Sequence, residues 1–309
     1  MENKNKLTKT PVVAFLALVC CLLWGSAFSG VKTGYEKFGI ESSDWPSQMV
    51  FAGIRFAVAG IMVIIFGSFS EKKILLPTFK SLPKIAVISF FQTVAQYFFY
   101  YIGLAHTTGV NASIIVGANV FFAILFSSLI FRMEKLTPLK ILGSVIGFGG
   151  IIAINWGKVS GGMSLNFFGD GFIFICTVAS GLSSVFMKKY SADENPVMLS
   201  GWQFFFGGLV MFFFGFFNGG KMTGFTLSST SVLLYLSFVS ASAYSLWATL
   251  LKYNPVSKVS VYGFLNPVCG VIISSLVLGE SGSFGFGGIV ALVLVSVGIY
   301  IVNCGKDDR

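Results

Sequence analysis

Apolar runs of about 20 residues recur from one end of the chain to the other, and each is long enough to cross a bilayer as a helix. Of the 309 residues, 55% are hydrophobic and only 11% are charged. A soluble globule of this length needs more polar surface than such a composition supplies. The sequence therefore predicts a protein that lies in a lipid bilayer and crosses it many times.

Polar residues, prolines and glycines divide the apolar sequence into ten segments. The expected fold class is an all-α membrane protein with ten transmembrane helices. The first segment is as long as the others and continues through Trp24, so we expect a membrane helix there rather than a cleaved signal. The predicted helices span residues 12–34, 48–67, 84–104, 110–131, 138–156, 170–189, 198–217, 231–251, 257–278 and 284–303.

The basic residues fall mostly on one side of the predicted helices. If the N-terminus is cytoplasmic, 16 of the 21 Lys and Arg residues lie in cytoplasmic segments, four lie outside, and Arg55 lies within the second helix. Short cytoplasmic loops of membrane proteins are enriched in positive charge. The distribution predicts a plasma or bacterial inner membrane protein with both termini in the cytoplasm. Because the net charge of +9 is scattered over loops, nucleic acid is not an expected partner.

The sequence contains no pattern typical of a metal or cofactor site. Its five cysteines lie within or beside apolar runs and lack CxxC spacing, so we interpret them as small hydrophobic residues. A GxxxxGK[ST] phosphate loop is also missing from the sequence. We therefore expect no metal and no cofactor, and the sequence specifies no particular oligomeric state.

One segment of the first half is repeated in the second half. Residues 53–67 read GIRFAVAGIMVIIFG and residues 201–215 read GWQFFFGGLVMFFFG, with three glycines in each at an offset of 148 residues. The same offset relates GIIAIN at 150–155 to GIYIVN at 298–303. Because a unit of five helices is odd, its second copy must enter the membrane from the opposite side. The sequence predicts two inverted repeats, at residues 12–156 and 168–303.

Several local patterns occur in order along both halves of the sequence. They are Trp24-Gly25-Ser26, Arg55-Phe56, the short connection Leu104–Ala112, Glu134, Asn266-Pro267 and Leu278-Gly279-Glu280. Together these patterns resemble the EamA-type members of the drug/metabolite transporter superfamily. The resemblance implies ten helices around a central cavity, lined mainly by helices 1, 3, 4, 6, 8 and 9, and transport of a small-molecule substrate by alternating access. Many relatives export amino acids or other small metabolites.

The fourth helix departs from the family pattern. The position that matches Pro267 of the ninth helix is Phe121, so the fourth helix lacks the proline break that the resemblance implies. For this reason we do not expect symmetric gating by the fourth and ninth helices.

Ten polar and aromatic residues within the predicted helices are candidates for substrate binding. Helix 3, for example, places Gln92, Gln96 and Tyr100 on one face because they are four residues apart. Together the ten predict a neutral cavity with aromatic walls and amide groups, which suits a small amphipathic or zwitterionic solute. Each residue alone is also explained by hydrogen bonding or packing between helices. The set is Trp24, Gln92, Gln96, Tyr100, Asn119, Ser240, Tyr244, Trp247, Tyr262 and Asn266.

Three ionisable residues are candidates for a charge role. Arg55 lies halfway along the second helix, where it either serves function or binds backbone carbonyls and reaches toward a membrane face. No Asp or Glu lies in the middle of a predicted helix, so we expect facilitated transport or exchange. Asp170, at the start of helix 6, and His106, at the outer end of helix 3, are the remaining positions for proton coupling.

We therefore expect a transporter that exports a small amphipathic metabolite such as an amino acid. A membrane enzyme is disfavoured because the predicted helices carry no paired carboxylates, HExxH or Ser/His pair. A non-transporting receptor is disfavoured because the loops are short. The alternative within transporters is an exchanger of nucleotide sugars or phosphorylated sugars, whose anionic groups favour several Lys or Arg residues in the cavity.

Overall fold

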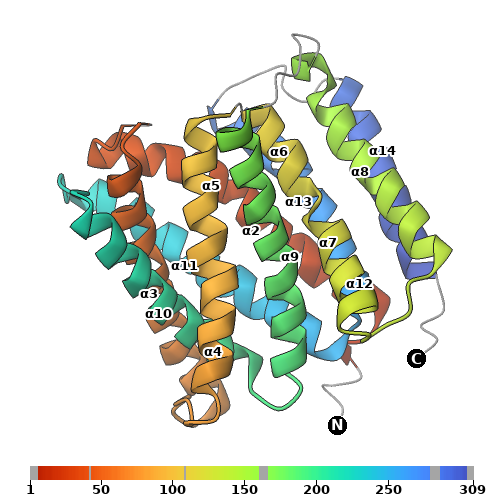
Figure 1. Ribbon diagram of the computed structural model, residues 1–309, viewed down its shortest axis with the longest axis horizontal. Coiled ribbons are helices and arrows are strands. Elements are labelled where there is room, and N and C mark those ends of the chain that lie inside the picture. The colour runs from red at the N-terminus through yellow and green to blue at the C-terminus, as the bar shows by residue number, and fades with distance from the viewer. Residues whose placement is uncertain (1–5, 42, 108, 160–165, 279–285, 305–309) are drawn as a thin grey trace.

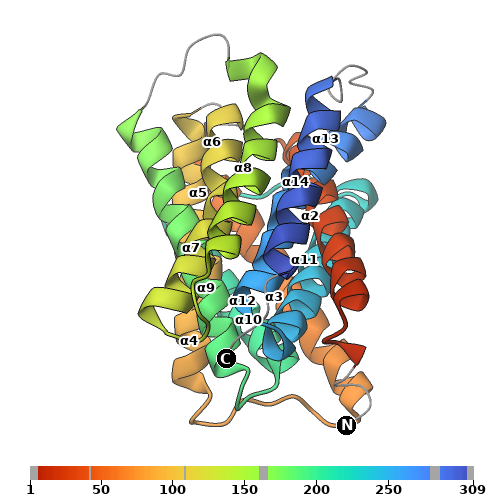
Figure 2. The ribbon, with the colours of Figure 1, turned by 90° about the vertical axis from the view of Figure 1, so that its right-hand side faces the viewer.

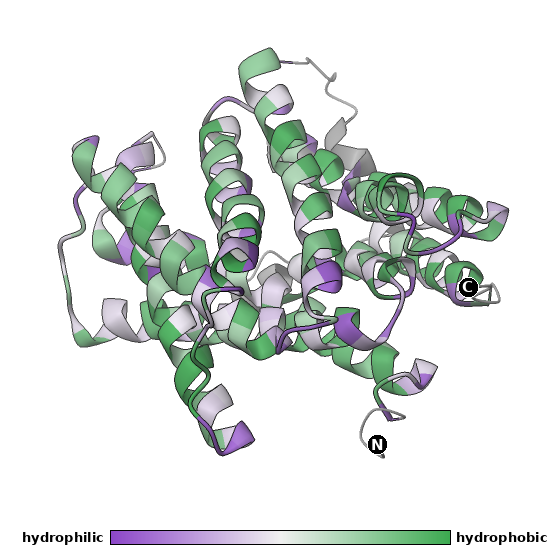
Figure 3. Cartoon of the chain, turned by 60° about the horizontal axis from the view of Figure 1, so that its bottom comes forward, coloured by the Kyte–Doolittle hydropathy of each residue, from purple (hydrophilic) through white to green (hydrophobic). Residues whose placement is uncertain are grey.

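The computed structural model describes residues 6–41, 43–107, 109–159, 166–278 and 286–304. Ten helices in this part of the chain are long and apolar enough to cross a membrane, which confirms the predicted all-α class. Hydrophobic residues cover these helices, and hydrophilic residues gather at their ends and in the loops (Figure 3). This distribution suits helices whose backbone groups are satisfied internally and whose side chains face lipid.

Helices of the first half form the first five spans. The third and fourth spans are each composed of several consecutive helical segments. In chain order the elements are α2 (Thr10–Phe38), α3 (Trp45–Glu71), α4 (Leu82–Ser89), the π-helical η1 (Phe90–Ala95), α5 (Gln96–Ala105), α6 (Gly109–Gly117), α7 (Asn119–Leu125), the π-helical η2 (Phe126–Ile130) and α8 (Pro138–Val159).

The second half has the same plan, with a ninth span of several segments. Figure 2 shows that α2 begins, and the last helix ends, toward the same end of the bundle. In chain order the elements are the π-helical η3 (Phe167–Gly171), α9 (Phe172–Tyr190), α10 (Pro196–Phe217), α11 (Leu227–Tyr253), α12 (Val256–Ser260), the 3-10 segment η4 (Val261–Phe264), α13 (Leu265–Leu278) and α14 (Phe286–Cys304).

Capping residues set the ends of the long helices. Before α3, the side chain of Asp44 accepts a hydrogen bond of 3.1 Å from the amide of Ser47, and before α10, Asn195 accepts one of 2.8 Å from Val197. α2 ends at Gly39, whose φ of 64° lies in the left-handed region that glycine adopts without strain. These helices therefore extend a few residues beyond the apolar runs that marked them in the sequence.

The fourth and ninth spans are both interrupted. α6 ends at Gly117 and α7 begins two residues later, so the fourth span breaks at Ala118 although it has no proline at Phe121. A Cβ atom on Gly117 would lie 2.3 Å from the end of the Ile151 side chain in α8, so the two helices pack closely at this glycine. Glycine also weakens a helix, which accounts for a break that the missing proline did not predict. In the ninth span, η4 ends shortly before Pro267.

The second span of each half packs against its counterpart. α3 and α10 form one edge of the molecule (Figure 1). A Cβ atom on Gly60 would lie 2.5 Å from the backbone nitrogen of Phe205, and one on Gly208 would lie 2.4 Å from that of Ala57. Gly60 and Gly208 are equivalent positions of the two repeats, and so are Ala57 and Phe205, because each pair is 148 residues apart. Each contact is therefore the image of the other, as expected for inverted repeats around a pseudo-two-fold axis.

The fifth span of each half obeys the same symmetry at the opposite edge, where α8 lies beside α14 (Figures 1 and 2). A Cβ atom on Gly143 would lie 2.7 Å from the carbonyl oxygen of Gly298, and one on Gly150 would lie 2.9 Å from that of Ala291. These contacts are again related by 148 residues. Small residues let the backbones approach closely where lipid supplies no hydrophobic force for association.

Between these edges the two halves interlock. α2 of the first half packs against α11 and α13 of the second, and α9 of the second half packs against α5 and α7 of the first. Spans 1, 3, 4, 6, 8 and 9 therefore form the interior of the bundle, and they carry all of the predicted substrate-binding residues.

Candidate functional site

Trp24 lies among aromatic side chains of α11. The centroid of its ring is 5.1 Å from that of Tyr244 and 5.1 Å from that of Trp247, both with edge-to-face geometry. The indole Nε1 of Trp24 is buried and has no hydrogen-bond partner. Three of the predicted site residues thus meet where α2 of the first half packs against α11 of the second.

Tyr244 also connects α11 to the third span. Its hydroxyl lies 2.9 Å from the hydroxyl of Tyr97, and it interacts with the side chain of Gln96. Tyr97 packs on Phe56 with ring centroids 4.5 Å apart, and Tyr244 packs on Phe204 at 4.9 Å. Trp24, Phe56, Tyr97, Phe204, Tyr244 and Trp247 are here called the aromatic cluster.

The aromatic cluster lies on the pseudo-two-fold axis. Phe56 and Phe204 are equivalent residues of the two repeats, and their rings stack at 5.2 Å with an interplanar angle of 4°. Tyr97 and Tyr244, which differ by 147 residues, are nearly equivalent in the same way. The site is therefore built from residues of both halves and does not belong to either half alone.

Arg55 lies at the edge of the aromatic cluster. Its Nη2 donates a hydrogen bond of 2.9 Å to Ser240, its Nε donates one of 3.4 Å to the carbonyl of Leu236, and its guanidinium carbon is 5.1 Å from the centroid of the Phe56 ring. Only 4% of the residue is exposed, so it does not extend toward a membrane face. Arg55 therefore bonds to α11 of the other half. Its bond to the Leu236 carbonyl agrees with the interpretation of Arg55 as a residue that binds backbone carbonyls.

The other predicted binding residues lie outside the hydrogen-bonded core of the site. Gln92 is buried with an unpartnered Oε1, and Asn266 has a buried, unpartnered Oδ1. Tyr100 packs edge-to-face on its neighbour, and Asn119 lies 3.5 Å from Ser180 of α9. Tyr262 is a buried residue of the main hydrophobic core. All five lie on the same interior spans. Tyr100 packs in the same hydrophobic cluster as Phe56 and Phe204, and Tyr262 packs in the same core as Trp247, but no hydrogen bond between described residues joins any of the five to the aromatic cluster.

Asp170 and His106 lie near one end of the bundle. Asp170 accepts hydrogen bonds from Thr107, from the amide of Asn166 at 2.7 Å and from Asn111 at 3.4 Å. This carboxylate therefore ties the third and fourth spans of the first half to the start of the second half. The His106 side chain is exposed, and the structure gives neither residue a contact with the aromatic cluster.

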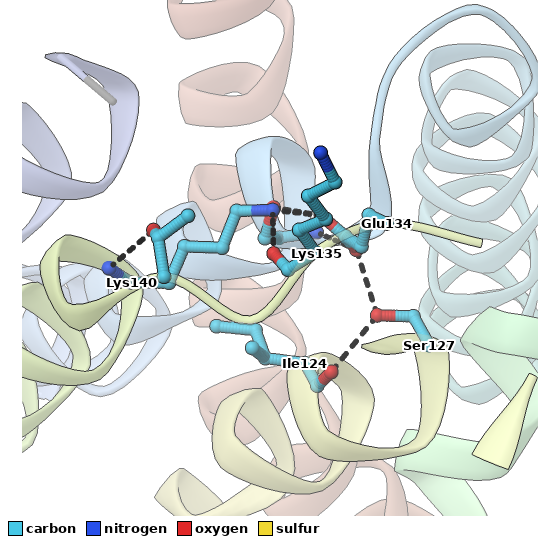
Figure 4. Close-up of polar contacts among 7 residues, drawn as sticks. Ile124, Ser127, Glu134, Lys135 and Lys140 are labelled. Carbon is cyan, nitrogen blue, oxygen red and sulfur yellow. Dashed lines mark hydrogen bonds and ion pairs between the residues drawn. The ribbon is translucent and has the colours of Figure 1, made fainter. Parts of the chain in front are cut away.

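A second carboxylate cluster ties the halves together at the opposite end. Glu134 forms an ion pair of 2.7 Å with Lys140 and accepts a hydrogen bond of 2.7 Å from Ser127 (Figure 4). It also accepts hydrogen bonds from the hydroxyl of Ser257 and, at 3.0 Å, from the Ser257 amide in α12 of the second half. Lys140 donates a further bond of 2.9 Å to the carbonyl of Lys135.

The surroundings of Glu134 determine its ionisation. Burial alone would raise the pKa of this carboxyl, but the hydrogen bonds from Lys140, Ser257 and Ser127 outweigh burial and hold the pKa below its ordinary value. Glu134 is therefore a carboxylate at neutral pH. Glu280, which with Glu134 belongs to the residues that carry the family resemblance, lies outside the described residues.

Sequence reasoning missed Phe56, Tyr97, Phe204 and Ser257. Tyr97 is not four residues from Gln92, Gln96 or Tyr100, so the spacing that selected those three left it out. Phe56 and Phe204 look like ordinary apolar residues, yet both directly follow the aligned positions 55 and 203, and that equivalence was the available signal. Ser257 acts partly through its backbone amide, which no side-chain pattern reveals.

The described residues contain no group of three or more His, Cys, Asp or Glu side chains placed to hold a metal ion. Ten apolar helices in two inverted halves, with a polar and aromatic site on their shared axis, instead define a multi-pass membrane transporter. The EamA-like transporter family matches residues 12–156 and 167–304, so the chain belongs to this family. This confirms the predicted resemblance and the expectation of a transporter rather than an enzyme.

Relatives of similar length are transporters by name. An uncharacterized transporter of Archaeoglobus fulgidus is 25% identical over 283 residues, which cover 90% of this chain and 94% of that protein. The uncharacterized inner membrane transporter YedA of Escherichia coli is 28% identical over 295 residues, 91% of this chain and 89% of that protein. A solved crystal structure with 16% identity and a TM-score of 0.77 over 95% of this chain and 97% of its own has the same fold.

Proposed function

We propose that the protein exports a small amphipathic solute, such as an amino acid, by alternately exposing the interface between its two halves. The observation that carries this proposal is the hydrogen bond between Tyr97 of the first half and Tyr244 of the second, beside the unpartnered indole nitrogen of Trp24. An indole N–H next to a neutral hydroxyl pair, amides and aromatic rings is suited to an uncharged or zwitterionic solute.

The moving units of this proposal are the predicted repeats, residues 12–156 and 168–303. Asp170 ties them together at one end of the bundle and Glu134 at the other. A transporter that opens to one side at a time has to break one of these ties while it keeps the other. The ten predicted residues remain the proposed substrate-binding set, with the aromatic cluster as the centre of the site. Arg55 remains a candidate for a charge role, and Asp170 and His106 remain the positions at which proton coupling is tested.

Charge and similarity both favour a cell membrane with cytoplasmic termini. The excess of Lys and Arg on the side of the N-terminus follows the distribution of cytoplasmic loops. YedA, which resembles this chain along most of its length, is named an inner membrane transporter. We therefore place the Glu134 tie at the cytoplasmic end and the Asp170 tie at the outer end.

Solute counterflow in proteoliposomes tests the proposal. Vesicles loaded with a mixture of amino acids, or with a mixture of phosphorylated sugars, are assayed for uptake of the labelled members of each mixture. We expect counterflow with amino acids and loss of it in Gln96→Ala, Tyr244→Phe and Asn266→Ala. Phe66→Ala, at a position 63% exposed on the outer surface of α3, is the control and retains flux. Flux with the phosphorylated sugars alone, or flux that all three site variants leave unchanged, would refute the proposal.

A further inference from the structure

Arg55 brings a positive charge into the middle of the bundle, and the part of the chain that the structure describes offers it no carboxylate partner. It is 4% exposed and lies on the second span. None of the ion pairs among the described residues includes it. Its hydrogen bonds go to a hydroxyl and a carbonyl and use two of the five N–H groups of the guanidinium. Buried charges in proteins are ordinarily paired, so this one calls for a counter-ion.

The second half of the molecule shows that a charge is not required for the packing role. Gln203 occupies the position equivalent to Arg55, and its Oε1 accepts a hydrogen bond of 2.7 Å from Thr93 in the third span of the first half. Arg55 makes the corresponding bond to Ser240 in the eighth span of the second half. A neutral amide therefore also forms a bond between the halves at this position, as an acceptor where Arg55 is a donor, and the charge of Arg55 has to be explained in another way.

The surroundings of Arg55 belong to the proposed site. The hydroxyls of Tyr35, Tyr97, Tyr101 and Tyr244 all lie within reach of the positive charge of Arg55. The Tyr35 hydroxyl is buried beside Tyr101 and has no other partner among the described residues. A cation next to phenolic hydroxyls forms an environment that favours a bound anion, because the guanidinium and the hydroxyls that do not already donate within the Tyr97–Tyr244 pair can donate hydrogen bonds to it.

We propose that Arg55 is the positive group that recognises a carboxylate on the transported solute, a proposal that rests on the function proposed above. The guanidinium binds the carboxylate, the tyrosine hydroxyls donate to its remaining oxygen lone pairs, and the apolar part of the solute packs on the aromatic cluster. A single cation balances a single negative charge, so a monocarboxylate fits this site and a phosphate dianion does not.

Thermal stabilisation of the purified full-length protein by matched compounds tests this assignment. The probes are phenylacetate against phenylacetamide, indole-3-acetate against indole-3-acetamide and L-phenylalanine against L-phenylalaninamide, with phenyl phosphate as the dianion. We expect at least one carboxylate to raise the Tm while its amide does not. Arg55→Gln, which copies the arrangement of Gln203, should bind that carboxylate about 30-fold more weakly.

Thr93→Val is the matched control, because it removes the equivalent bond to Gln203 and leaves the charge of Arg55 in place. It should keep the preference for the carboxylate. The assignment is overturned if no carboxylate raises the Tm, if each amide stabilises as well as its carboxylate, if only phenyl phosphate stabilises, or if Arg55→Gln keeps the preference. The matched compounds decide the question on the wild-type protein even if Arg55→Gln does not fold.

Ligand binding, measured by the Tm, and solute flux, measured by counterflow, test this inference and the proposed function independently. Carboxylate-selective stabilisation without counterflow of any solute would refute transport and leave the anion site in place. Counterflow of amino acids together with equal stabilisation by carboxylates and amides would refute the role of Arg55 and leave transport in place.

Discussion

The hydroxyl of Tyr97 lies 2.9 Å from the hydroxyl of Tyr244, and this contact joins the third span of one repeat to the eighth span in the other. The two tyrosines pack on the stacked rings of Phe56 and Phe204, which are themselves equivalent across the repeats. The polar contact between the halves is therefore placed on the axis about which they are related. A relative movement of the halves changes this contact directly.

Removing either hydroxyl of the pair should weaken the same interaction. Tyr97→Phe and Tyr244→Phe are each expected to destabilise the protein by about 1 kcal/mol, the usual net value of a hydrogen bond, and the double variant by little more than one of them. Tm measurements on the two single variants and the double variant give the coupling. Strictly additive losses would mean that the two hydroxyls do not interact.

Enlarging a glycine between α3 and α10 should disrupt the joint between the repeats. A Cβ on Gly60 or Gly208 meets backbone atoms at 2.5 Å and 2.4 Å, and backbone cannot move aside as a flexible side chain can. We expect Gly60→Ala and Gly208→Ala each to cost about 1–3 kcal/mol of stability and to lower the Tm. Gly149→Ala is the control, because its Cβ would have its nearest neighbour at 3.9 Å. Equal Tm values for all three variants would show that the helices are not in close contact.

The interactions of Glu134 should make the stability of the protein depend on pH in the acidic range. Because its pKa is lowered in the folded state, the carboxylate stabilises the fold fully above its ordinary pKa of 4.5, and this contribution is lost as the pH falls through the lower folded-state value. At neutral pH we expect Glu134→Gln to cost about 3 kcal/mol, because Lys140 is left buried without its partner.

The measurement is the Tm of wild type and of Glu134→Gln between pH 7 and pH 3. The difference between the two proteins should be constant above pH 4.5 and should shrink below it. Glu134→Gln/Lys140→Met is the matched control, since it removes both charges and should recover part of the lost stability. A difference that grows as the pH falls would show that the pKa of Glu134 is raised instead.

Transport is expected to proceed without a proton gradient. Among the described residues, Asp170 is the carboxylate nearest to the interior of a span, and it is engaged by Thr107 and Asn111 at one end of the bundle. Amino acid counterflow should therefore be equal with and without a pH difference across the vesicle membrane. Accumulation driven by the pH difference, and its loss in Asp170→Asn but not in His106→Gln, would instead identify Asp170 as a proton carrier.

Much of the fold could be predicted from the sequence, because apolar length and the repeat are both local patterns. The glycines at 60 and 208 marked the repeat in the sequence, and the structure shows that each packs against the helix that carries the other. The break at Ala118 was not predicted, because glycines also lie within helices that continue unbroken, such as Gly60 in α3 and Gly208 in α10.

The site was only partly predictable. Trp24, Gln96, Tyr244 and Trp247 were selected by residue type and spacing, and the structure brings them together. Tyr97 was not selected, because its spacing along the third span does not mark it. The partner of its hydroxyl, Tyr244, lies across the axis in the other half. A contact between two halves is a property of their arrangement, and neither half carries a pattern for it.

Accessibility of the site from the two sides of the membrane would decide whether the halves alternate. A single cysteine is introduced as Gln96→Cys after the five native cysteines are replaced, and an impermeant thiol reagent is added either outside oriented proteoliposomes or within them. We expect modification from both sides, with the ratio of the two rates changed by the transported amino acid. Modification from one side alone, at a rate that the solute leaves unchanged, would show that the interface between the halves does not open alternately.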